Sequence, residues 1–469
     1  MRIRLPSFPS CGAFSTGSAA RSTASGRADK KSSLTLDTSI AATGSAYRSY
    51  VLAVLTVVYT LGLMDRGLIS LLLQPIKEDL RLSDTELGFL TGIAFALFYA
   101  TLGLPIARWA DRSDRVTITS LAIGVWGVTV MACLFVSTFV QLLFARIAAA
   151  VGEAGCMPPT YSLVGDYFRT PVARARAMAV YMLANPFCNL ASFIVGGYLN
   201  ARYGWRMTFF IAGIPGLLLA AVVRLTIREP RLRAAASVRR SDDRSPRMTE
   251  VLAHLWSQPS VRNLMIAIVL LFTMGLGLQP WYAAFLMRSH GMDTAAVGLW
   301  LGLIFGIGGI IGTLGGAYVA TRWFGEDAQS QTRLSALMIG SLVIFFVPFL
   351  LLPGKYQALS AFVGMPIALF VFIGPTYALL QRLVPDEMRA TTLSVSMLLA
   401  NLIGMGIGPQ VVGILSDLLH PSFGAESLRY AMLIMSFIAP ASGFYFWCAA
   451  RTVNRDLLSV AASRIEKPA

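Results

Sequence analysis

The sequence of 469 residues contains few charged residues, which make up only 13% of the chain. Soluble domains contain about 25% charged residues. Hydrophobic residues account for 55% of the chain, and the mean hydropathy is +0.64. Much of this hydrophobicity lies in repeated apolar runs of about 20 residues, which a soluble core does not need. The shortage of charge therefore argues against a soluble domain and predicts an all-α, multi-pass membrane protein.

Cysteine and histidine are also scarce, and neither forms a cluster. The five cysteines are scattered without a C-x-x-C pair, and the three histidines (His254, His290 and His420) lie near span ends or in loops. This pattern predicts no disulfide framework, no metal site and no cofactor. It also argues against a membrane-embedded enzyme, because no span supplies a nucleophile with a histidine base or a set of metal ligands.

Hydropathy divides the chain into twelve predicted membrane spans separated by short polar connectors. They lie near residues 50–73, 85–107, 116–138, 140–165, 175–199, 206–227, 262–287, 295–320, 333–353, 357–384, 389–418 and 427–450.

The excess of positive charge, +15 at neutral pH, is concentrated on one side of these spans. If the N-terminus is cytoplasmic, most Lys and Arg residues fall in cytoplasmic connectors, as the positive-inside rule requires. The basicity is therefore a topology signal, and no nucleic-acid-binding motif accompanies it. We expect a multi-pass protein of the inner (plasma) membrane with both termini cytoplasmic, no nucleic-acid partner and a monomeric state.

Polar segments divide the chain into five parts. We expect a disordered cytoplasmic tail at 1–47 and a six-helix bundle at 48–228. A basic cytoplasmic linker should follow at 229–260, a second six-helix bundle at 261–451, and a cytoplasmic tail at 452–469. The two halves echo each other weakly, which fits a transporter whose halves rock about a central site. A receptor without transport activity remains an alternative.

Four ionisable residues lie well inside predicted spans: Asp65 and Arg66 in the first span, and Arg146 and Glu153 in the fourth. A charge at this depth costs about 2.5–3.5 kcal/mol on insertion scales and marks a functional site by default. Counted from the cytoplasmic side at a rise of about 1.5 Å per residue, Asp65 and Glu153 differ in depth by only ~5 Å. We therefore expect one charged site in the first half.

The chemistry of these four residues suggests separate roles. A low-dielectric cavity favours a protonated carboxyl, and a nearby guanidinium opposes this. Asp65 and Glu153 are therefore predicted to exchange protons, with Asp65 favoured as the carrier. Arg66, which stays protonated, is the predicted anchor for an anion, whereas Arg146 either assists it or packs within its own half. The alternative is a static ion pair that only holds the two spans together.

Candidates for the rest of a solute site come from the second half. Gln279 and Tyr282 lie in the seventh span and Tyr377 in the tenth, among further aromatic residues. Together they offer polar groups and apolar surface for a small amphiphilic or organic-anion solute. Ordinary helix packing is the alternative for each aromatic residue.

Two further clusters have local explanations. In the connector after span 2, Asp111, Arg112 and Arg115 alternate in sign, which a pure topology signal does not need. We predict that they form a gating motif, with Asp111 latching the cytoplasmic side. By contrast, Ser83 and Glu86 have the spacing of a helix capping box, and we assign them no chemistry.

Glycines in the eighth predicted span do not form a dinucleotide-binding loop. Gly308, Gly312 and Gly316 have small-xxx-small spacing in an apolar run. That spacing predicts close packing of two membrane helices.

Several of these segments together resemble one family. "ARWADRSDR" (107–115) is similar to the loop 2–3 signature of the major facilitator superfamily, G-x-x-x-D-R-x-G-R-R, and "RIAAAVGEA" (146–154) to its span 4 signature. With "MDRGLIS", "YGWRMTFF", "REP", "NLIGMGIGPQVVGILSD" and "ESLRY", the chain resembles the bacterial Spinster-type branch from about 48 to 450. Organic anion:cation symporters and drug exporters of the same superfamily are the alternatives.

The resemblance implies a fold of six plus six helices and transport by alternating access. It assigns coupling and cavity charge to Asp65, Arg66 and Glu153. It assigns the loop signature to Asp111, Arg112 and Arg115, with Ala107 and Asp114 as departures from the usual residues. Animal relatives move lysophospholipids or sphingoid phosphates, but the solute of this chain does not follow from that. The expected partners are a small-molecule or lysolipid-like solute, protons and the lipid bilayer.

Overall fold

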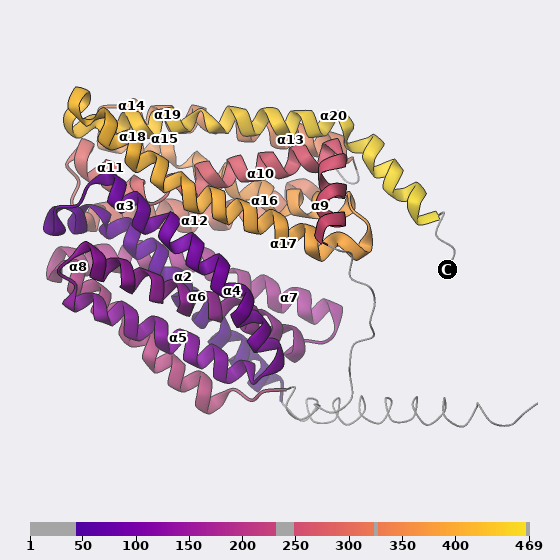
Figure 1. Ribbon diagram of the computed structural model, residues 1–469, viewed down its shortest axis with the longest axis horizontal. Coiled ribbons are helices and arrows are strands. Elements are labelled where there is room, and N and C mark those ends of the chain that lie inside the picture. The colour runs from indigo at the N-terminus through magenta and orange to yellow at the C-terminus, as the bar shows by residue number, and fades with distance from the viewer. Residues whose placement is uncertain (1–43, 231–247, 323–326, 466–469) are drawn as a thin grey trace, which may run out of the picture.

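The computed structural model describes residues 44–230, 248–322 and 327–465, which contain helices and no strand. Figure 1 shows two helical bundles, one above the other, with their long helices running across the view. The helices of the first bundle are α2 (Ser45–Leu80), α3 (Asp84–Thr91), α4 (Ile93–Arg112), α5 (Arg115–Ala132), α6 (Phe139–Tyr167), α7 (Pro171–Met182) and α8 (Ala184–Thr226).

The second bundle follows a short crosswise helix, α9 (Met248–Ser257). Its long segments are often divided into shorter helices, and one of them contains a π-helix, η3 (Ala400–Ile407). The other helices are α10 (Pro259–Leu278), α11 (Trp281–His290), α12 (Thr294–Arg322), α13 (Ala328–Gly340), α14 (Leu342–Leu351), α15 (Lys355–Phe362), α16 (Gly364–Arg382), α17 (Arg389–Leu399), α18 (Gly408–Phe423), α19 (Ser427–Ser436) and α20 (Ile438–Ile465).

Ten segments of the described chain are long and apolar enough to cross a membrane. Two of them, Pro171–Thr226 with 56 residues and Thr391–Val460 with 70, are long enough for two crossings each. Each turns at a glycine with positive φ, Gly204 in the first and Gly424 in the second. Each of the two also matches a pair of adjacent predicted spans, so the ten segments contain the twelve predicted crossings. The all-α multi-pass fold is confirmed.

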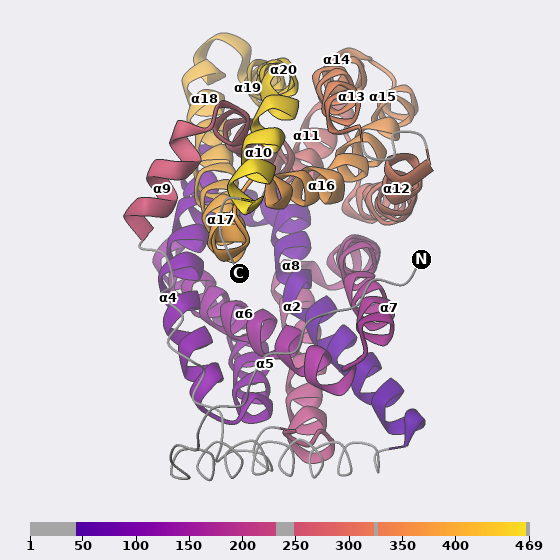
Figure 2. The same ribbon diagram turned by 90° about the vertical axis from the view of Figure 1, so that its right-hand side faces the viewer.

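The two bundles meet at one end of the molecule. We call the end that carries α3 and α11 the far end, and the end that carries α7, α9 and α17 the linker end (Figure 1). Contacts between the bundles join α8 to α12, α3 to α18, α2 to α11 and α4 to η3. Figure 2, seen from the linker end, shows α7 and α17 apart from each other.

Glycines of α12 allow close packing against helices of both bundles. A Cβ on Gly312 would lie 2.6 Å from the backbone oxygen of Ile367, and one on Gly316 would lie 2.2 Å from that of Val371, both in α16. The predicted small-residue packing is therefore confirmed. A second row of glycines faces α8 of the other bundle: at Gly298 a Cβ would lie 2.2 Å from the Phe193 oxygen. The two helices can approach this closely because no side chain intervenes.

The helices extend beyond some of the predicted boundaries. In the predicted linker, residues 248–257 form α9, and 231–247 lie outside the described residues, as do 1–43 and 466–469 of the predicted tails. At the other boundary α20 continues to Ile465, because "RTVNRDLLSV" contains no glycine or proline to end it. The capping box is confirmed, since Glu86 donates its backbone N–H to the Ser83 hydroxyl at 3.1 Å and accepts one from the Ser83 backbone at 2.8 Å.

Candidate functional site

The four charged residues predicted inside the spans form two ion pairs between α2 and α6, and together we call them the central charge cluster. Asp65 on α2 pairs with Arg146 on α6. Both residues are almost fully buried, at 2% and 3% exposure. This pair is enclosed within the first bundle, where it satisfies both charges and joins the two helices.

The second pair is more accessible. Arg66 lies 2.5 Å from the Glu153 carboxylate, and the Arg66 side chain is 26% exposed whereas that of Glu153 is 2% exposed. Apart from Arg66, no described group donates a hydrogen bond to either oxygen of Glu153. Glu153 therefore depends on one partner, and that partner is partly open to its surroundings.

Aromatic rings and one residue of the other bundle surround Arg66. Its guanidinium lies 5.1 Å from the ring centre of Phe95 and 5.2 Å from that of Tyr99, both on α4. These distances suit cation–π contact. One guanidinium nitrogen also lies 3.2 Å from the sulfur of Met405, in the π-helix η3. Arg66 thus links the charge cluster to the second bundle, at a π-helical turn of the kind often found at functional sites.

Within the described part of the chain, none of the predicted residues of the second half forms a hydrogen bond or ion pair with this cluster. Tyr282 is fully buried and packs against phenylalanine rings, with Phe362 at a centroid distance of 4.9 Å and Phe305 at 5.8 Å. Gln279 is half-buried at the end of α10, and Tyr377 is half-buried on α16. The hydroxyls of both tyrosines have no hydrogen-bond partner among the described residues.

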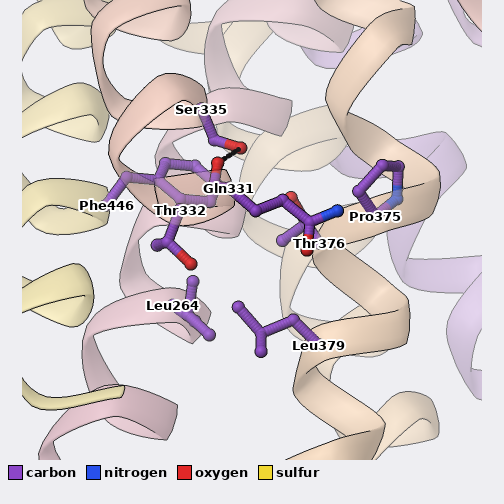
Figure 3. A pocket seen from close by; sticks show the side chains of 8 residues that line it. All are labelled: Leu264, Gln331, Thr332, Ser335, Pro375, Thr376, Leu379 and Phe446. Atoms are coloured by element: carbon purple, nitrogen blue, oxygen red, sulfur yellow. Dashed lines mark hydrogen bonds between the residues drawn. The ribbon is translucent and has the colours of Figure 1, made fainter. Parts of the chain in front are cut away.

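A small pocket lies inside the second bundle, and none of the predicted site residues lines it. Figure 3 shows its lining by Leu264, Gln331, Thr332, Ser335, Pro375, Thr376, Leu379 and Phe446. The hydroxyl of Ser335 donates to the Gln331 backbone oxygen at 3.0 Å, and that of Thr332 to the Ala328 oxygen at 2.7 Å. Because these hydroxyls are satisfied by their own helix, we assign no ligand to the pocket.

At the far end, a buried carboxylate joins the two bundles. Asp84, at the start of α3, is 2% exposed and accepts two hydrogen bonds of 2.7 Å from Arg288 on α11. It also accepts one of 2.6 Å from Ser416 on α18, and Lys77 of its own bundle lies at 2.6 Å. Bidentate carboxylate–guanidinium pairs are among the strongest polar contacts in proteins.

A second carboxylate, on the second bundle, also binds the start of α3 and joins the two bundles. Asp417 on α18 accepts hydrogen bonds from the backbone N–H of Asp84 at 3.1 Å and of Thr85 at 2.7 Å. These N–H groups belong to the first turn of α3, where a negative charge is favoured by the helix dipole. We call Lys77, Asp84, Arg288, Ser416 and Asp417 the far-end network.

Sequence reasoning missed this network because each member has a plausible local explanation. Asp84 lies inside the Ser83–Glu86 capping box, and Arg288 and Asp417 lie at predicted span ends, where charges are common. The available signal was the excess of carboxylates in "SDTELG", because a capping box needs only Glu86.

The predicted gating motif is only partly described. Arg115 is buried and binds within the first bundle: it pairs with Glu229, lies 2.8 Å from Asp166, and donates to Ser162 at 2.7 Å. Asp114, which departs from the resembled signature, caps α5 by accepting from the Val116 N–H at 3.0 Å. Asp111 and Arg112 end α4, but their side chains lie outside the described residues.

Comparisons with known proteins agree with this arrangement. Residues 55–409 match the family described as Major Facilitator Superfamily. An "MFS-type efflux pump" of Mycolicibacterium smegmatis is 32% identical over 418 residues, which cover 87% of this chain and 94% of that protein. "Protein spinster homolog 1" of Xenopus tropicalis is 26% identical over 450 residues, covering 88% and 83% of the two chains.

A solved structure is similar over nearly the whole fold. It is the crystal structure of a bacterial homologue of the human lysosomal transporter Spinster, in an inward-facing and unoccupied conformation. The two structures superpose with a TM-score of 0.75 and share 28% identity, covering 88% of this chain and 99% of that one. The chain therefore belongs to the major facilitator superfamily, as a membrane transporter of the Spinster type.

Proposed function

We propose that the protein is a proton-coupled secondary transporter that works by alternating access. It moves a small amphiphilic, lysolipid-like or organic-anion solute across the inner membrane, with both termini cytoplasmic. The single observation that carries this proposal is the Arg66–Glu153 pair, in which a buried carboxylate has, among the described residues, one partner, a partly exposed guanidinium.

The distribution of contacts supports an inward-facing conformation. The far-end network and the Gly298 contact with Phe193 hold the bundles together at the far end, whereas α7 and α17 lie apart at the linker end (Figure 2). The concentration of Lys and Arg in the connectors at the linker end favours that end as cytoplasmic. The similar bacterial structure is also in an inward-facing conformation.

Coupling between solute and proton follows because Glu153 and an anionic solute share one binding partner, Arg66. An anionic solute that binds Arg66 competes with Glu153 for the same guanidinium. A buried carboxylate that loses its only cationic partner favours its protonated form. Binding of the solute and uptake of a proton by Glu153 are therefore linked, and each promotes the other.

This geometry favours Glu153 over Asp65 as the group that exchanges protons. Asp65 pairs with Arg146, and both are enclosed in the first bundle. Arg146 accordingly belongs to this internal pair rather than to the anion site, and Asp65 holds the cluster in place.

The surroundings of Arg66 support an amphiphilic anion. The guanidinium can bind a phosphate or carboxylate in two-point fashion, while Phe95, Tyr99 and Met405 provide apolar surface for a hydrocarbon chain. The second candidate function is drug export, and the 32% identity to a protein named an efflux pump favours export as the direction.

A ligand screen separates these functions. We would measure the melting temperature of the purified protein at pH 5.5 and 7.5 with single-chain phospholipids, sphingoid phosphates, organic carboxylates and cationic drugs. An anionic amphiphile that raises the melting temperature more at the lower pH supports the proposal, and Arg66→Gln should abolish the shift. Stabilisation by cationic drugs alone, unaffected by Arg66→Gln, supports drug export instead.

A further inference from the structure

The short helix α9, between the two bundles, is amphipathic but only partly covered by protein. At about 100° per residue, its five large apolar residues fall on one continuous face about 140° wide. Val251 and Leu255, on one edge of this face, are buried at 0% and 3% exposure, where α9 contacts α10 and α17. The other edge carries Met248, Leu252 and Trp256, which are 54%, 46% and 67% exposed.

The spacing of the exposed residues makes them a single stripe. Met248, Leu252 and Trp256 follow one another at intervals of four residues, so they stack along one side of the helix. Thr249, Ala253 and Ser257 are exposed on the neighbouring side. We call Met248, Leu252 and Trp256 the α9 stripe.

The position of α9 limits what can cover this stripe. Figure 1 shows α9 running across the direction of the long helices at the linker end, and Figure 2 places it at the outer edge of the molecule. A helix of 10 residues is about 15 Å long, which is too short to cross a bilayer. The next helix, α10, begins two residues later at Pro259 and is a candidate membrane span.

We propose that the α9 stripe inserts into the bilayer leaflet at the linker end, so that α9 lies in the membrane interface and anchors the connection between the two bundles. A helix lying across the bundle axis at the end of a span has its exposed side at the depth where headgroups meet acyl chains. Amphipathic helices with a Trp or Leu face adopt this position.

The positive charges near the α9 stripe also favour a lipid bilayer as its partner. The guanidinium of Arg262, at the start of α10, lies 5.9 Å from the ring centre of Trp256. Tryptophan and arginine are both favoured at the interface, where the ring meets the acyl chains and the guanidinium reaches the phosphates. The sequence before α9, "RLRAAASVRRSDDRSPR", is rich in arginine, which suits a surface of anionic headgroups. Insertion of the α9 stripe depends neither on the solute nor on the direction of transport.

Fluorescence quenching tests the insertion directly. A cysteine-free protein with Leu252→Cys is labelled with an environment-sensitive fluorophore and reconstituted into phosphatidylcholine–phosphatidylglycerol vesicles. Ala253→Cys, about 100° around the same helix, is the matched control. We expect a nitroxide placed at the headgroup end of the acyl chain to quench the Leu252 label several-fold more than the Ala253 label, and aqueous iodide to show the opposite order.

Two results would overturn the proposal. Weak quenching of both labels by the lipid nitroxide, together with strong quenching of both by iodide, would show that the stripe faces water. A Leu252 label protected from both the nitroxide and iodide would show that protein covers it, either a second copy of the chain or another segment.

A second pair of variants keeps the test independent of the label at Leu252. With the fluorophore at Met248→Cys, Leu252→Asp should remove most of the quenching by lipid, whereas Ala253→Asp should leave it unchanged. The melting temperature should be the same for both variants, because both side chains are exposed. Retained quenching in Leu252→Asp would count against insertion.

Discussion

At the scale of single residues, the two ion pairs of the central charge cluster differ in their surroundings. Asp65 and Arg146 are both enclosed, whereas Arg66 has one accessible side and contacts the second bundle through Met405. A charge buried in a membrane protein needs a partner to offset its desolvation. In the mechanism that we propose, Asp65 and Arg146 stay paired, whereas the partly accessible Arg66 exchanges Glu153 for a solute while Glu153 takes up a proton.

Asp65→Asn should therefore lower the stability of the folded protein. The change leaves the Arg146 guanidinium buried without a counter-charge, which costs about 3–5 kcal/mol in typical cases. We expect a clear fall in melting temperature, and Asp65→Asn combined with Arg146→Gln should recover part of it. The measurement is thermal unfolding of the purified variants.

The matched control is Asp79→Asn, in the exposed pair with Arg206, whose side chains are 42% and 33% exposed. Exposed pairs contribute about 0–1 kcal/mol, so this variant should melt close to the unsubstituted protein. If Asp65→Asn also melts normally and instead loses the pH dependence of transport, Asp65 is the proton carrier that the sequence favoured.

At the scale of helices, the far-end network should set how often the far end opens. Asp84→Asn removes the charge that holds Arg288 and Lys77. Hydrogen bonds to charged groups contribute about 1.5–3 kcal/mol, so their loss should raise the open population about tenfold or more. Electron–electron distance measurements between spin labels at Arg202→Cys and Ser422→Cys, which are exposed on the two bundles at this end, report the change.

Glu86→Gln is the control for this prediction, because Glu86 belongs to the capping box and to α3 alone. It should leave the distance distribution unchanged. An identical distribution in Asp84→Asn would mean that the far-end network does not hold the bundles together.

Close packing of α8 and α12 gives a separate test at the same scale. In Gly298→Ala the new Cβ would lie 2.2 Å from the Phe193 oxygen, a contact that forces the two helices apart. The far end should then open more often, with a longer spin-label distance. Gly315→Ala on the same helix is the control, because nothing lies within 4 Å of its Cβ position, and it should behave like the unsubstituted protein.

The sequence predicted the positions of the helices better than it predicted which side of each helix faces a cavity or a neighbouring helix. Charge inside a span identified Asp65, Arg66, Arg146 and Glu153, and small-residue spacing identified the packing at Gly312. Which carboxylate pairs with which arginine depends on helix rotation, which hydropathy does not determine. Tyr282 shows the same limit, because an aromatic residue in a span can face a cavity or, as here, a cluster of phenylalanines.

At the scale of the whole molecule, the sequence predicted the division into spans, but the contacts between the bundles depend on conformation. The far-end network joins residues more than 200 positions apart, such as Asp84 and Arg288, and such a contact leaves no local pattern. The glycines that face α8 are equally invisible, since one helix sequence does not reveal its partner. The structure shows one conformation, and we expect the contacts between the bundles to open during the transport cycle.

At this scale we propose that Glu153 couples proton movement to solute transport through Arg66. The most direct measurement is solute-driven proton flux, followed with a pH-sensitive dye inside proteoliposomes, using the anionic amphiphile found by the thermal screen. The unsubstituted protein should move protons with the solute, whereas Glu153→Gln should lose this flux and still exchange labelled for unlabelled solute. Undiminished proton flux in Glu153→Gln, or an absence of proton flux in the unsubstituted protein during active exchange, would show that Glu153 does not couple protons to the solute.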